Sequence, residues 1–250
     1  MSAYAALTRA TYVASVRDKT TLFFTFAFPL AFLVLFGLIF QGQQVEGGLA
    51  SINYIAPGVL SWGVGNAAVF SVAFALMQWR RDDLLRLIWR TPTPLRVLIA
   101  SRWTVALFVA FAQTLLFTTV ALLPFFGLRL NGPWWAGLPL LVLGTTAFLA
   151  MGLVVGSIAD TPEAVAAIAN LVMVPMAFLS GSFFPDDLMP SWLRTAAKVL
   201  PLHYLNDGLT DAMGGRGDLG DIAVDCAGLV VFALIFGLIA TRIFRWSNRT

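Results

Sequence analysis

Apolar residues gather in six long runs that contain no Asp, Glu, Lys or Arg. The runs cover residues 20–45, 47–79, 103–128, 130–159, 164–185 and 226–241. A bilayer core about 30 Å thick needs roughly 20 apolar residues in a helix, so each of the first five runs can span it. The sixth run becomes long enough when residues 222–224 are added, which places Asp225 near one membrane interface.

This pattern predicts an all-α integral membrane protein with six transmembrane helices in a single domain, residues 1–250. The expected spans are 21–40, 53–78, 103–126, 137–158, 164–183 and 222–242. A soluble protein is excluded because so many apolar helices in 250 residues would leave too little chain to cover them. The expected location is therefore the cell membrane, as a multi-pass protein of the bacterial inner membrane.

Basic residues fall mainly in alternate gaps between the apolar runs. Of the 16 Lys and Arg residues, all but Arg129, Arg194, Lys198 and Arg216 lie in the N-terminal segment, the gap between the second and third runs, or the C-terminal segment. Cytoplasmic segments of membrane proteins carry this excess, so both termini are expected to face the cytoplasm. The net charge of +3 follows from this topology and does not indicate a nucleic-acid partner.

The predicted cytoplasmic segment 79–102 contains a short amphipathic pattern. Leu84, Leu85, Ile88 and Trp89 fall on one helical face, and Pro92 follows as a stop signal. One interpretation is a basic anchor on anionic lipid headgroups. The other is a helix that docks on a partner protein.

The predicted outer segment 184–221 is too long for a simple turn. Pro190 begins a pattern that places Trp192, Leu193, Ala196 and Leu200 on one side. Pro201 begins a second, with Leu202, Leu205, Leu209 and Ala212 on one side, and Gly214 and Gly215 follow it. The segment therefore predicts a short re-entrant-type pair of helices before the last span.

Within the spans, small residues and prolines predict close packing and kinks. Gly152 and Gly156 have helix-packing spacing, as have Ser61 and Gly65. Pro29 and Pro175 would free backbone carbonyls in the first and fifth helices. The polar residues Asn66, Gln113 and Asn170 either form interhelical hydrogen bonds or line a substrate path.

The chain lacks the residue sets that carry common chemistries. It contains no phosphate-binding GxxxxGK[ST] sequence, and its one histidine, His203, and one cysteine, Cys226, are interpreted as packing residues. The tripeptide at residues 216–218 is treated as a chance match. No catalytic residues, metal site or cofactor are expected in this chain, and an ion-coupled carrier is disfavoured because the first five spans lack ionisable groups at depth.

Three stretches resemble the ABC-2 type permease family, and within it the daunorubicin-resistance group of exporter permeases. They are residues 29–37, the loop that ends with residues 90–96, and residues 179–202. The most specific motif residues are Gly181, Phe183, Phe184, Pro185, Pro190, Trp192, Leu193 and Pro201. Family members often follow the first acidic residue of the loop with glycine, whereas Asp82 is here followed by Asp83.

The resemblance implies a permease that forms a homodimer, or a heterodimer with a related permease, and exports a hydrophobic compound. A separate ABC ATP-binding subunit would hold ATP and Mg²⁺. The implied coupling helix comprises Arg80, Arg81, Asp82, Asp83, Leu84, Leu85, Arg86, Ile88, Trp89, Arg90, Thr91 and Pro92. Residues 4–20 would form an N-terminal interfacial helix, in contact with membrane lipids.

Other functions stay open on the sequence. The same architecture could export a polysaccharide or a lipid-linked glycan, although 21 Phe against 4 Tyr favours a hydrophobic cargo over a sugar. A non-transporting membrane scaffold or a resistance sensor is the alternative of another class.

Overall fold

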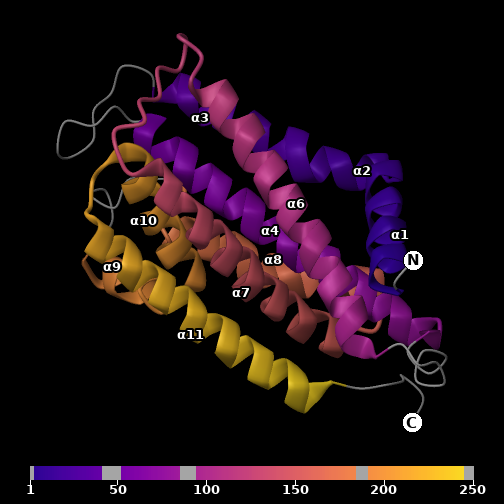
Figure 1. The fold of residues 1–250 in the computed structure, drawn as a ribbon. Coiled ribbons are helices and arrows are strands. Elements are labelled where there is room, and N and C mark those ends of the chain that lie inside the picture. The colour runs from indigo at the N-terminus through magenta and orange to yellow at the C-terminus, as the bar shows by residue number, and fades with distance from the viewer. Residues whose placement is uncertain (1–2, 41–51, 85–93, 184–190, 245–250) are drawn as a thin grey trace.

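The structure is a computed structural model that describes residues 3–40, 52–84, 94–183 and 191–244, and all regular elements in these residues are helical. Figure 1 shows a bundle of long helices with shorter ones at its ends. The elements are α1 (Ala3–Arg17), α2 (Lys19–Leu22), the π-helix η1 (Phe23–Ala27), α3 (Phe28–Ile39), α4 (Ile52–Arg81), α6 (Leu95–Ala121), the 3-10 helix η2 (Trp134–Ala136), α7 (Gly137–Ile158), α8 (Pro162–Leu179), α9 (Ser191–Ala197), α10 (Pro201–Gly214) and α11 (Leu219–Ile243).

Six helical stretches in the described part of the chain are long and apolar enough to cross a membrane. They are Lys19–Ile39, Ile52–Arg81, Leu95–Ala121, Trp134–Ile158, Pro162–Leu179 and Leu219–Ile243. The predicted all-helical class with six candidate spans is confirmed. The side of the membrane on which each end lies stays a prediction.

The third span differs from the expected range because it begins at Leu95 and not at 103. Pro94 has an extended backbone, so the helix starts directly after it. The sequence pattern placed the start later because Arg96 and Arg102 interrupt the apolar run. Arg102 lies over the Trp79 ring, 5.3 Å from its centroid, and this contact accommodates the charge beside the helix.

The core lies where α4 meets α7. Gly152 and Gly156 face α4, where an added Cβ would come 2.5 Å from the carbonyl oxygen of Val69 and 2.7 Å from that of Ala73. No larger residue fits there without separating the two helices. The predicted packing role of these glycines is confirmed.

The first span has a kink that the neighbouring α6 stabilises. Pro29 has no backbone N–H to donate to the carbonyl of Thr25, and the π-helix η1 lies at this point. The buried Gln113 side chain donates from Nε2 to the Thr25 carbonyl oxygen at 2.6 Å. Pro29 therefore acts as predicted, and Gln113 joins the kink to α6.

α10 is too short to span a membrane, yet eleven of its residues are buried between α4, α7 and α11. The predicted face of Leu202, Leu205, Leu209 and Ala212 is fully inside. Gly215 ends the helix with φ of 72°, a left-handed conformation that favours glycine. On α9, Trp192 is 70% exposed, whereas Leu193 and Ala196 are half-buried, and the predicted contact of this helix with the outer leaflet stays a prediction.

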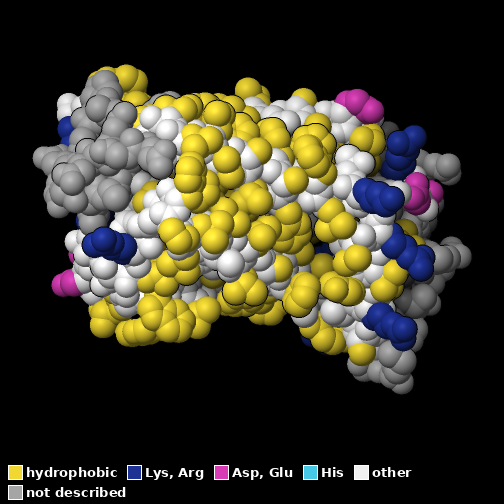
Figure 2. All heavy atoms as spheres, turned by 90° about the horizontal axis from the view of Figure 1, so that it is seen from above, with side chains coloured by type: hydrophobic (Ala, Val, Ile, Leu, Met, Phe, Trp, Pro, Cys, Tyr) yellow, Lys and Arg dark blue, Asp and Glu magenta, His cyan; other side chains and the backbone are white. Residues whose placement is uncertain are grey.

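The two ends of the bundle differ in charge. Figure 1 shows that α4 and α11 both run toward the end at which α1 lies. Figure 2 shows a broad hydrophobic band, and most of the visible Lys and Arg side chains lie at that same end. α1 itself packs along α6, where Tyr12 contacts Phe108 edge to face. This asymmetry agrees with the expected cytoplasmic end, and the interfacial position of α1 stays a prediction.

Candidate functional site

The expected coupling segment begins on α4 itself. Arg80 and Arg81 form the last turn of this helix, Asp82 and Asp83 form a turn, and Leu84 follows. The remaining residues of the segment lie outside the described residues; they are Leu85, Arg86, Ile88, Trp89, Arg90, Thr91 and Pro92.

Asp83 lies where family members often carry glycine. Its φ is 53°, in the left-handed region, and it is the one described non-glycine residue with positive φ. Asp is among the few residues that tolerate this region, because its short side chain causes little steric conflict there. The chain therefore keeps the turn that a glycine would favour.

Arg80 is buried rather than presented on the surface, being 2% exposed. One guanidinium nitrogen, Nη1, donates to the carbonyl oxygens of Gly156 at 2.9 Å and of Ala159 at 3.1 Å. The other, Nη2, donates to Asp160 Oδ1 at 3.0 Å. The side chain therefore points into the bundle and satisfies the C-terminal end of α7.

The three expected substrate-path residues lie on different helices, and their role in a path stays a prediction. Gln113 is buried and bonded to Thr25, Asn66 is half-buried on α4, and Asn170 is exposed on α8. Gln113 matches the alternative interpretation, an interhelical hydrogen bond, and its Oε1 has no hydrogen-bond partner among the described residues.

Aromatic rings from distant segments pack together beside α4. Phe183 contacts Phe32 and Phe36 of α3 at centroid distances of 5.7 and 5.4 Å, and Trp62 at 5.4 Å. Phe178 on α8 contacts Phe183 at 5.3 Å. This cluster gives the family-motif residue Phe183 a packing position between the first, second and fifth spans.

Backbone geometry explains a second motif residue. Gly181 has φ of 72°, which ends α8 and reverses the chain. The turn packs so closely on α4 that an added Cβ at Gly58 would overlap the Ser182 carbonyl oxygen. Of the other motif residues, Pro201 begins α10 and Leu193 lies on α9, whereas Phe184, Pro185 and Pro190 lie outside the described residues.

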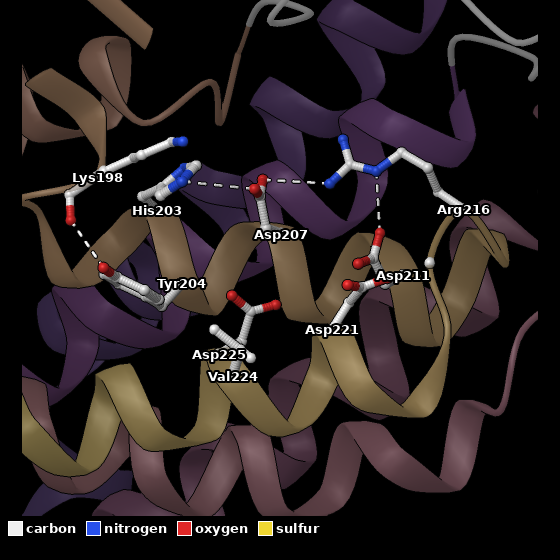
Figure 3. A pocket seen from close by; sticks show the side chains of 10 residues that line it. Lys198, His203, Tyr204, Asp207, Asp211, Arg216, Asp221, Val224 and Asp225 are labelled. Carbon is white, nitrogen blue, oxygen red and sulfur yellow. Dashed lines mark hydrogen bonds and ion pairs between the residues drawn. The ribbon is translucent and has the colours of Figure 1, made fainter. Parts of the chain in front are cut away.

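A pocket of about 520 Å³ lies between α10, the turn after it and the start of α11. Figure 3 shows its charged lining: Lys198, His203, Asp207, Asp211, Arg216, Asp221 and Asp225. Arg216 Nε donates to Asp211 Oδ1 at 2.9 Å, and Arg216 Nη2 lies 3.5 Å from Asp207 Oδ1. Burial raises the pKa of Asp211, and the Arg216 charge opposes this effect.

Sequence reasoning missed this pocket. His203 was interpreted as a packing residue only. In the structure its Nε2 also lies 3.6 Å from Oδ2 of Asp207. The signal that could have indicated the pocket is the four-residue spacing of Asp207 with Asp211 and of Asp221 with Asp225, which puts each pair on one helical face. Among the described residues no three His, Cys, Asp or Glu side chains are grouped to hold a metal ion.

Comparison with known proteins identifies a matching family and several relatives of this chain. Residues 2–213 match the family model of the ABC-2 type transporter. The chain is 26% identical over 236 residues to DrrB1, a daunorubicin resistance ABC transporter permease protein of Streptomyces coeruleorubidus. This similarity covers 88% of this chain and 78% of DrrB1.

Two further relatives match over shorter stretches. Nodulation protein J of Rhizobium leguminosarum bv. trifolii is 32% identical over 108 residues, which is 43% of this chain and 41% of that protein. The linearmycin resistance permease protein LnrN of Bacillus subtilis is 29% identical over 110 residues, 44% of this chain and 28% of that protein. The chain thus spans less than half of these two relatives.

Proposed function

Because the chain belongs to the ABC-2 type transporter family, we propose that it is the transmembrane permease subunit of an ATP-driven exporter of a hydrophobic or amphipathic compound. The cargo would be a drug, an antibiotic or a lipid that leaves from the cytoplasm or the inner leaflet. The family match over residues 2–213 carries this proposal, since it includes both the coupling segment and the motif after α8. Two relatives are named for resistance to daunorubicin and linearmycin.

The energy comes from a separate ATP-binding subunit, which holds ATP and Mg²⁺. Residues 81–92 dock on this partner, with Leu84, Leu85 and Trp89 as the apolar contacts. ATP binding closes the partner, and the permease dimer shifts between states with different access, because the partner binds one state more tightly. Two copies of this chain, or one copy with a related permease, enclose the path.

The aromatic cluster around Phe183 and Trp62 supports an apolar cargo. Its rings come from α3, α4, α8 and the turn after α8, and Phe178 presents an exposed aromatic side chain next to the buried Phe183 and Trp62. Trp62 Nε1 is buried with no hydrogen-bond partner among the described residues, which leaves one donor in this apolar region.

Reconstitution with the ATP-binding subunit tests the proposal. The permease is purified from gently solubilised membranes, co-purifying proteins are identified, and the complex is placed in liposomes with fluorescent hydrophobic drugs. We expect a co-purifying ATPase and ATP-dependent movement of drug. Stimulation by a lipid-linked glycan alone would indicate the glycan exporter, and absence of any ATPase would favour the scaffold or sensor.

The docking segment has its own test. Replacing both Leu85 and Trp89 with Asp should abolish association with the ATPase while membrane insertion stays normal, because two charges then face an apolar contact. The matched control is Val199→Asp, at an exposed position in the predicted outer segment. Normal co-purification of the double variant would contradict the docking assignment.

A further inference from the structure

Arg80 lies where three helices meet at the end of the bundle that holds the coupling segment. It belongs to the last turn of α4, its guanidinium reaches the end of α7, and Asp160 is followed at once by Thr161, which caps α8. The side chain is buried, so it is not available for contact with a partner protein.

The contacts of Arg80 are directed at the end of a helix. The carbonyls of Gly156 and Ala159 belong to the last turn of α7 and the residue after it, where a helix has unpaired acceptors and partial negative charge. Arg80 supplies donors and positive charge to both carbonyls from one nitrogen, and to Asp160 from the other. A lysine cannot reproduce this planar two-nitrogen arrangement.

α4 and α7 are in direct backbone contact up to the Arg80 position. The glycines of α7 at 152 and 156 allow the Val69 and Ala73 carbonyls of α4 to approach, and Arg80 continues the same line of contact. α8 is held differently. It packs chiefly on α4 through one stripe of Val165, Ala169, Met173, Met176 and Ala177, and large side chains such as Leu171 are exposed on its other side.

We propose that Arg80 is a positioning residue that passes movement of the coupling segment into the α7–α8 corner, and so along α8 to the Gly181 turn and Phe183. This inference rests on the proposed function. The coupling segment begins with Arg80 and Arg81 in the last turn of α4, so movement of the segment acts on that turn. Arg80 joins that turn to the Gly156 and Ala159 carbonyls at the end of α7 and to Asp160, two residues before α8 begins.

The test uses the complex of permease and ATPase in liposomes. Transported drug, hydrolysed ATP and co-purification are measured for the wild type and for Arg80→Met, Arg80→Lys, Asp160→Asn and Arg242→Met. The last variant removes an exposed basic charge near the end of α11 and serves as the control. Melting temperatures of all variants are recorded in detergent.

We expect Arg80→Met to keep its ATPase but to lose about tenfold in drug moved per ATP hydrolysed, a typical size for coupling between sites. Arg80→Lys should keep a higher ratio than Arg80→Met, because lysine retains the positive charge but has only one donor nitrogen. Asp160→Asn should change the ratio little, because Asp160 is 66% exposed and the carbonyl contacts remain. Arg242→Met should match the wild type.

Three results overturn the inference. An unchanged ratio in Arg80→Met overturns it while the proposed function stands. Parallel loss of co-purification, hydrolysis and melting temperature shows a merely structural role. A wild-type complex without ATP-driven transport overturns the proposed function, and the inference with it. If Arg80→Met is not recovered from membranes, Arg80→Lys decides, since a wild-type ratio in that variant contradicts the proposal.

Discussion

Single residues show how this chain accommodates backbone groups that its prolines and turns leave unpaired. Thr25 loses a donor because Pro29 has no N–H, and Gln113 of α6 supplies one from another helix. The sequence predicted the freed carbonyl but not its partner, because a hydrogen bond between residues 88 positions apart depends on how helices pack. The left-handed backbone of Asp83 could not be predicted from the residue itself, because Asp usually has a negative φ. The only indication was that family members often carry glycine at this position.

The Gln113 contact can be measured with a double-mutant cycle. Gln113→Leu should destabilise the protein by about 1–3 kcal/mol, because a buried carbonyl loses its donor. Pro29→Ala supplies a backbone N–H to the same carbonyl, so the double variant Pro29→Ala/Gln113→Leu should lose less than the sum of the single variants. Denaturation in detergent gives each value. Strictly additive losses would show that the two residues do not share Thr25.

At the scale of helices, the bundle is organised by how closely α4 and α7 approach. The glycine spacing in the sequence predicted this contact correctly, because small residues four apart form one face of any helix. The start of α6 was predicted too late, because a rule based on charge-free runs cannot anticipate that Trp79 receives Arg102.

Two glycines provide a matched test of this crossing. Gly152→Ala should markedly lower the melting temperature, because the new methyl group would meet the Val69 carbonyl oxygen, and overpacking typically costs about 1–3 kcal/mol. Gly237→Ala, on α11, meets nothing within 4 Å and should leave stability equal or slightly higher. Heating in detergent followed by size-exclusion chromatography compares them. Equal melting temperatures would mean that the crossing is not close-packed.

The whole molecule combines a predictable membrane pattern with a charged pocket that was harder to foresee. The six spans follow from the lengths of the apolar runs alone, because the thickness of the bilayer core sets the number of apolar residues that a spanning helix needs. The charged pocket does not, because Asp207, Asp211, Asp221 and Asp225 read as scattered acidic residues until α10 folds against α11. The substrate path stays a prediction, because the polarity of a residue in a helix does not state which way its side chain faces.

Orientation is a property of the whole chain and has a direct test. With both termini in the cytoplasm, a fluorescent protein fused after Thr250 should fluoresce, and alkaline phosphatase fused there should be inactive, because it folds only outside. Phosphatase inserted after Gly217, in the turn between α10 and α11, should be active. The reverse pattern would contradict the orientation read from the basic residues.

The burial of α10 bears on how the protein is made. Its neighbours α4 and α7 precede it along the chain, whereas α11 follows it, so its pocket cannot close while the nascent chain ends at residue 214. At that stage Asp207 and Asp211 of α10 lack the side of the pocket that α11 provides. The pocket is completed only when α11 packs against α10, so α10 depends on a helix made after it for part of its burial.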